Sequence, residues 1–182
     1  MSAGEHKTLW RSDITGLRAL AVIPVVLYHA YASLVPGGFV GVDVFFVISG
    51  YLISGIIFRN LQKKNTVGYL DFYQKRIRRI FPNLILLLVF VMTMGYFYMW
   101  DEELRELGKH VYSSAAFYQN FRLMAGLDYF GPDARTMPLL HLWSLSIEEQ
   151  FYLLFPVLCG LVWRIRRSEK ALGVLVVFIT CL

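Results

Sequence analysis

Residues 81–100 read FPNLILLLVFVMTMGYFYMW, a run without a single charged side chain. As an α-helix, a run of this length rises by about 30 Å, the thickness of the hydrocarbon core of a bilayer. A backbone in lipid finds hydrogen-bond partners only within its own segment, so the run is expected to be helical. This stretch therefore predicts a transmembrane helix.

Further apolar runs lie on both sides of this segment. The chain is 57% hydrophobic and only 17% charged, which is too apolar for an ordinary soluble domain. We predict an all-α fold, a polytopic transmembrane helix bundle with about four spans and a truncated fifth. The short fifth run indicates that residues 1–182 are the N-terminal part of a larger membrane protein, or a truncated gene product. The predicted segments are 17–35, 37–58, 81–100, 142–163 and 171–182.

Basic residues indicate how the spans are oriented. Lys7 and Arg18 precede or open the first span, and further basic clusters occupy 59–79 and 164–170. Cytoplasmic segments of membrane proteins are enriched in lysine and arginine. The N-terminus is therefore predicted to be cytoplasmic, and 101–137 to form a connection on the outer face.

One stretch of that connection, HVYSSAAFYQNF (110–121), is moderately apolar. If it crossed the membrane fully, the basic cluster at 164–170 would face outward, against the usual charge distribution. We therefore predict an outer-face or re-entrant helix over 110–121, with an additional span as the alternative.

The first span carries two ionisable residues, Arg18 and His29. Their separation is close to three helical turns, so both are predicted to lie on one face, about 16 Å apart along the axis. Arg18 could also extend to the lipid headgroups, and His29 could cap a packed interface. Because histidine titrates near neutral pH, we favour His29 as a general base.

Asp43 lies in the motif GVDVFFVISGY, near the start of the second span. The connection between the first two spans is short, so Asp43 is expected near the level of His29, where a carboxylate would orient the imidazole. Alternatively, the acid only complements the helix dipole. The small residues Gly41, Gly50 and Gly55 are predicted to permit close helix packing.

Arg76 and Arg79 lie in the motif YQKRIRRIFP, just before the third predicted span. Three residues apart, they share a helix face. Guanidinium groups suit phosphate oxygens, but cytoplasmic arginines also fix topology and attract anionic lipid. Composition alone leaves both interpretations open.

Glu148 and Glu149 lie in the motif PLLHLWSLSIEEQFYLLFP, inside the fourth predicted span. Exposing two adjacent glutamates to lipid would cost much free energy, so at least one is expected to point into a protein or water-filled cavity. The alternative is an interfacial helix whose acids lie in water. Tyr152 is predicted to be a membrane-interface anchor.

Four motifs in order resemble the acyltransferase 3 family. These are DITGLRALAVIPVVLYHA, GGFVGVDVFFVISGYLIS, FYQKRIRRIFP and PLLHLWSLSIEEQFYLLFP. The family comprises bacterial membrane-bound O-acyltransferases, many of which acetylate surface polysaccharide. The resemblance covers residues 11–165 and is to the N-terminal portion of the family's membrane domain, which generally contains more spans than are predicted here.

The resemblance implies an enzyme that moves an acyl group from cytoplasmic acyl-CoA, usually acetyl-CoA, to a saccharide hydroxyl outside the bacterial inner membrane. The family's Arg-x10-His motif matches Arg18 and His29, and its Arg-x-x-Arg motif matches Arg76 and Arg79. His29 would take the proton of the acceptor hydroxyl; a covalent acyl-enzyme relay is the alternative. The candidate catalytic residues are His29, Asp43, Glu148 and Glu149, and the candidate donor-binding residues are Arg18, Arg76 and Arg79.

Membrane lipid, acyl-CoA and a saccharide acceptor are thus the expected partners. No spacing of histidines, cysteines or acids demands a metal, and neither a metal nor nucleic acid is predicted as a partner. Two other functions remain open from the residues alone. Buried charges could line the substrate path of a transport or permeation protein, or the chain could be an inactive truncated remnant.

Overall fold

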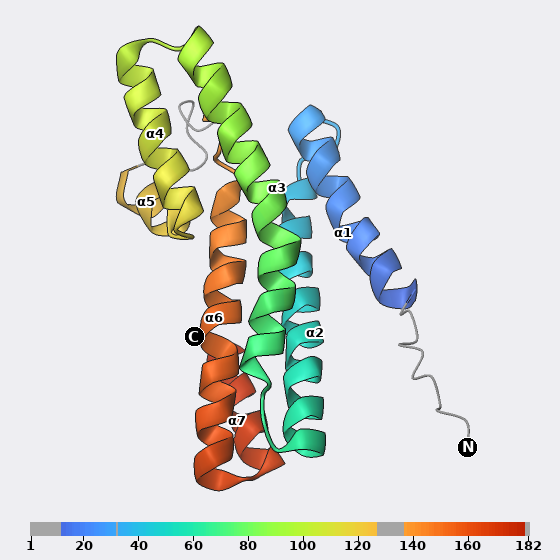
Figure 1. Cartoon of the computed structure of the whole chain (residues 1–182). Coiled ribbons are helices and arrows are strands. Elements are labelled where there is room, and N and C mark those ends of the chain that lie inside the picture. The colour runs from blue at the N-terminus through green and yellow to red at the C-terminus, as the bar shows by residue number, and fades with distance from the viewer. Residues whose placement is uncertain (1–11, 32, 127–136, 181–182) are drawn as a thin grey trace, which may run out of the picture. The chain divides into compact units, whose positions relative to one another are not determined.

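The computed structural model describes residues 12–31, 33–126 and 137–180 (Figure 1). All the regular elements in these ranges are helices, so the predicted all-α fold is confirmed. Lys7, residues 127–136 of the predicted outer connection, and residues 181–182 lie outside the described residues. The helices are α1 (Ser12–Ala30), η1 (Gly38–Val40), α2 (Gly41–Lys64), α3 (Tyr69–Tyr98), α4 (Asp101–Ala115), α5 (Gln119–Gly126), α6 (Leu142–Arg166) and α7 (Glu169–Thr180).

Within the described ranges, four helical segments are long and apolar enough to cross a membrane: α1, η1 with α2, α3 and α6. They correspond to the predicted spans, but their bounds differ. The third begins at Tyr69 rather than at residue 81, because the basic turn continues the helix. The helix α4, with 15 residues, is not among the four.

The chain divides within α2 into two compact units, residues 1–54 and 55–182. In the first unit, the beginning of α2 approaches α1 closely. A Cβ atom on Gly41 would lie 2.1 Å from the carbonyl oxygen of Ala21. Glycine is therefore required at this contact, as predicted. At Gly50 and Gly55 a Cβ would meet no described atom within 4 Å, so close packing at these two positions stays a prediction.

Replacing Gly41 with alanine is expected to destabilise the first unit. The added methyl group would collide with backbone, which cannot rotate aside, and such overpacking costs about 1–3 kcal/mol. The free energy of unfolding, measured by titrating detergent-solubilised protein with SDS, is expected to fall accordingly. Gly50→Ala is the matched control and should be neutral or slightly stabilising, because alanine favours helix by up to about 1 kcal/mol. Equal effects of both substitutions would contradict the contact.

In the second unit, α3 and α4 run side by side in opposite directions, α5 packs on α6, and α7 folds back along α6 (Figure 1). Leucines from α3, α4, the turn before α6 and the first residue of α6 form a buried core at the end of α3 nearest α4: Leu84, Leu88, Leu107, Leu139 and Leu142. This core fixes α4 and the beginning of α6 against the same half of α3.

The opposite end of α3 is held against α6 by its tyrosines. The Tyr73 hydroxyl donates to the carbonyl oxygen of Leu153 at 3.0 Å. Gly160 leaves room for Tyr69, since a Cβ there would lie 1.9 Å from the Tyr69 hydroxyl oxygen. These contacts direct the face of α3 that carries Arg76 toward α6.

The stretch 110–121, predicted as one helix, is divided between α4 and α5. The helix α4 ends at Ala115 and α5 begins at Gln119. Between them Phe117 adopts a left-handed conformation with φ 54°. Gln150 of α6 holds this turn, since its Nε2 donates to the Phe117 carbonyl oxygen at 2.7 Å.

Candidate functional site

The predicted site residues divide between the two units. Arg18, His29 and Asp43 belong to the first unit, which comprises residues 1–54. The second unit contains the remaining four, Arg76, Arg79, Glu148 and Glu149. The two groups are therefore described separately.

Arg76 and the two glutamates lie around Tyr152, where α3 faces α6. The Arg76 guanidinium carbon lies 3.9 Å from the centroid of the Tyr152 ring and 5.8 Å from that of Phe72. A guanidinium over an aromatic face is attracted by the ring quadrupole and is held in a fixed plane. This contact holds the Arg76 guanidinium against the Tyr152 ring.

The Tyr152 hydroxyl donates a hydrogen bond to Oε1 of Glu148, one helical turn earlier. Oε1 of Glu149 is buried without a hydrogen-bond partner among the described residues. The charges of Arg76 and Glu148 both act on the Glu149 carboxylate. Glu148 is therefore engaged by the tyrosine, whereas Glu149 keeps an uncommitted oxygen in a half-buried position near Arg76.

This arrangement can bind an anion. Within the described part of the chain, Arg76 makes aromatic contacts but no hydrogen bond, so its five N–H donors remain available. Guanidinium donors form strong, often bidentate hydrogen bonds with phosphate oxygens. The neighbouring Glu149 carboxylate could take up a proton or accept a hydrogen bond from a polar ligand.

Arg79 does not share this environment, although it is only three residues further along α3. Its side chain is exposed, while that of Arg76 is half-buried. Tyr152, predicted to anchor the helix at the membrane interface, is instead 3% exposed and contacts Arg76. Its role depends on a contact between helices that are distant in sequence, which periodicity does not reveal.

In the first unit, the His29 ring is held in one tautomer. Its Nδ1 lies 2.8 Å from the carbonyl oxygen of Val25, one turn earlier on α1. A carbonyl oxygen can only accept, so Nδ1 carries the proton and donates it. In the neutral ring Nε2 is then unprotonated, and it can accept a proton from another group.

Arg18 and Asp43 lie further along the same pair of helices. The Arg18 guanidinium carbon lies 4.9 Å from the centroid of the Phe45 ring, and Gly41 contacts Ala21. Asp43, between these two positions of α2, is therefore nearest the level of Ala21. This level is roughly 12 Å along α1 from His29. The expectation that Asp43 lies level with His29 is wrong, because Gly41, two residues before Asp43, already packs against Ala21 and Val25.

No group of three histidine, cysteine, aspartate or glutamate side chains that could hold a metal occurs among the described residues.

Comparison with known proteins tests the family that the four sequence motifs resemble. The sequence profile of a family described as "Acyltransferase domain" matches residues 11–182. The chain belongs to this family, the acyltransferase 3 family.

Relatives of this acyltransferase-family chain have been identified in Staphylococcus aureus. The protein named O-acetyltransferase OatA from strain NCTC 8325 / PS 47 is 41% identical over 146 residues, which is 79% of this chain and 24% of the relative. OatA from strain MRSA252 has the same identity and coverage. The chain thus spans about a quarter of the length of these curated relatives. No solved structure matches significantly.

Proposed function

We propose that the protein is a membrane O-acyltransferase that moves an acetyl group from acetyl-CoA to a hydroxyl of a saccharide in the cell envelope. The matched family supports acyl transfer, and the relatives' name, O-acetyltransferase, supports an acetyl group and an oxygen acceptor. The distribution of basic residues supports a cytoplasmic N-terminus in a bacterial inner membrane, with the donor on the cytoplasmic side and the acceptor outside.

The observation that carries this proposal is the tautomer of His29. With Nδ1 donating to Val25, Nε2 is free to take the proton of the acceptor hydroxyl. The hydroxyl oxygen then attacks the thioester carbonyl, and the tetrahedral intermediate expels the CoA thiolate. The imidazolium returns its proton to the thiolate, so that His29 ends each cycle neutral.

Arg76 is assigned to the phosphates of the donor. Its guanidinium is fixed on Tyr152 and has no hydrogen-bond partner within the described ranges. Arg79 is assigned to the same polyanionic donor as a further source of positive charge, and Arg18 stays a candidate donor-binding residue of the first unit. Glu148 and Glu149 stay candidate catalytic residues beside Arg76, where Glu149 keeps an oxygen available. Asp43 is given no role on His29, because of its position along α1.

Transfer of label from radiolabelled acetyl-CoA to the membrane saccharide fraction tests the proposal. Membranes containing the chain are expected to incorporate label that is released by mild alkali, as an O-acetyl ester is. Membranes without the chain provide the background. Label no higher than this background, at saturating acetyl-CoA, would contradict the proposed function for this chain.

A further inference from the structure

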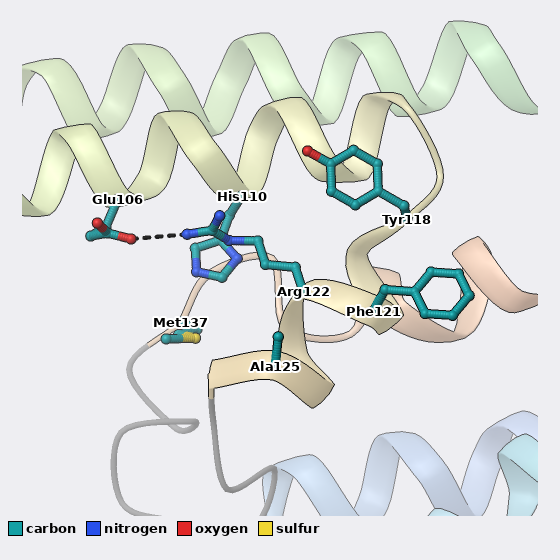
Figure 2. A pocket seen from close by; sticks show the side chains of 7 residues that line it. All are labelled: Glu106, His110, Tyr118, Phe121, Arg122, Ala125 and Met137. Carbon is teal, nitrogen blue, oxygen red and sulfur yellow. Dashed lines mark hydrogen bonds and ion pairs between the residues drawn. The ribbon is translucent and has the colours of Figure 1, made fainter.

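A pocket of about 630 Å³ lies between α4 and α5 (Figure 2), and Arg76 is not among the residues that line it. Its volume falls within the range of about 300–1,000 Å³ that is typical of small-molecule sites. Both helices belong to the second unit, and neither is among the candidate membrane spans. The lining residues are Glu106, His110, Tyr118, Phe121, Arg122, Ala125 and Met137.

The charged side of the pocket joins α4 to α5. Nη2 of Arg122 donates to Oε2 of Glu106 at 3.0 Å, and Lys109 donates to the other carboxylate oxygen. Nε of Arg122 is buried and has no hydrogen-bond partner among the described residues. A buried N–H without an acceptor is costly and needs an explanation. A ligand oxygen in the pocket would supply the missing acceptor.

His110 adds a second donor beside Arg122 (Figure 2). Its side chain is 7% exposed, and its Nδ1 lies 2.7 Å from Nε2 of Gln119. Gln119 is oriented by Ser113, whose hydroxyl donates to the amide oxygen, so the amide nitrogen donates to Nδ1. The proton of the neutral imidazole is therefore on Nε2.

The protonation of His110 predicts a pH dependence. Burial, and then the Arg122 charge, lower the pKa of His110 below its ordinary value of 6.5, while the Glu106 charge acts in the opposite direction and Lys109 adds to the lowering. The unfolded chain therefore binds more protons as pH falls through and below 6.5, so stability falls on acidification and is flat above that pH. The pKa of Glu106 is lowered, chiefly by its hydrogen bond from Lys109, so this acid stays ionised in the same window.

The thermal midpoint of the detergent-solubilised chain is expected to fall between pH 7 and pH 5. In His110→Gln, which has no imidazole, that part of the drop should vanish. An identical pH profile in both proteins would contradict the assignment of a buried, neutral His110.

The pocket offers donors and an acceptor together. Arg122 Nε–H and His110 Nε2–H can donate, whereas the Glu106 carboxylate can accept. An anion would be repelled by the Glu106 carboxylate, which pairs with both Arg122 and Lys109. A hydroxyl group can accept from Arg122 and donate to Glu106 at once. The half-buried Tyr118 ring supplies an aromatic surface beside these groups.

The pocket is attached to the helix that carries the two glutamates. Gln150 of α6 donates to the Asn120 side-chain oxygen at 3.0 Å as well as to the Phe117 carbonyl oxygen. Gln150 directly follows Glu148 and Glu149 in sequence. A ligand held between α4 and α5 is therefore placed by the same turn of α6 that holds these acids.

We propose that this pocket binds one sugar residue of the saccharide acceptor, with its hydroxyls hydrogen-bonded to Arg122, His110 and Glu106 and its ring against Tyr118. The identity of the bound saccharide as the acceptor rests on the proposed function, whereas the binding of a saccharide in this pocket does not. Arg122→Lys tests the contact selectively, because lysine keeps the ion pair with Glu106 but lacks the Nε–H donor. Tyr118→Leu removes the aromatic surface, and Tyr118→Phe retains it.

The experiment measures binding of the purified, detergent-solubilised chain to an array of immobilised uncharged mono- to trisaccharides. The wild-type chain is expected to bind at least one of them. Arg122→Lys and Tyr118→Leu should weaken that binding about tenfold, the equivalent of one lost polar or aromatic contact. Tyr118→Phe and the control Arg105→Met, which removes an exposed arginine of α4 that does not line the pocket, should bind as the wild type does.

Three results would overturn the proposal: no saccharide on the array is bound, binding is unchanged in both Arg122→Lys and Tyr118→Leu, or inorganic phosphate displaces the saccharide. Label transfer from acetyl-CoA separates this proposal from the proposed function. If saccharide binding depends on Arg122 but no label is transferred, the proposed function of this chain is contradicted and saccharide binding in the pocket is supported. If label is transferred and the KM for the saccharide is the same in Arg122→Lys as in the wild type, only the proposed role of the pocket is contradicted.

Discussion

Replacing His29 with alanine is expected to abolish label transfer from acetyl-CoA. A general base contributes about 10²–10⁴-fold to a reaction rate, and loss of that factor would bring transfer below detection. The effect follows from the position of one proton: Val25 fixes it on Nδ1, which leaves Nε2 to act as the base. Label transfer by membranes containing equal amounts of each protein is the measurement.

Two further variants make this result specific. His29→Gln keeps a polar side chain of similar reach but supplies no base, so it should be as inactive as His29→Ala. Val26→Ala alters an exposed neighbour on α1 and should stay active. Full activity of His29→Ala would eliminate His29 as the base and remove the main support for the proposed mechanism.

Replacing Arg76 with methionine is expected to raise the KM for acetyl-CoA by at least about 100-fold with a smaller change in kcat. Hydrogen bonds to a charged group contribute roughly 1.5–3 kcal/mol each, and a bidentate pair to phosphate supplies two. Arg76→Lys should recover only part of the affinity, because an ammonium group cannot lie flat on Tyr152 and donate in parallel. Steady-state kinetics with varied acetyl-CoA measure both parameters.

Arg78→Met is the matched control for Arg76→Met. Arg78 is an exposed arginine of the same helical turn, and its loss changes the net charge equally. It should alter the KM far less. Equal damage from Arg76→Met and Arg78→Met would mean that the turn attracts the donor or the lipid only through its total charge.

The membrane spans were predictable because each depends on local composition. The uncharged run of 81–100 located α3, and the few acids within the other runs did not conceal them. The start of α3 was not predictable from hydropathy, since the turn containing Arg76 and Arg79 interrupts the apolar run while the backbone stays helical from Tyr69. Charge ends a hydrophobic run without ending a helix.

The site was predictable in its residue types but less so in its contacts. Motif spacing identified Arg76, Glu148 and Glu149, yet only the packing of α3 on α6 reveals that Tyr152 lies between the arginine and Glu148. The pocket between α4 and α5 was missed because one helix was expected there. The left-handed Phe117 that separates α4 from α5 carries no glycine or proline signal.

The 30 residues of α3 form a helix of about 45 Å, well beyond the ~30 Å thickness of a hydrocarbon core. Only the part of α3 from residue 81 onward is without charge, and its length matches this thickness, so the first turns of the helix, with Arg76 and Arg79, extend into the headgroup layer. Acyl-chain length of the surrounding lipids therefore sets the depth of these arginines. A thicker bilayer draws them toward the hydrocarbon, and a thinner one lifts them toward water, so lipid composition itself tunes how readily an aqueous anion reaches α3.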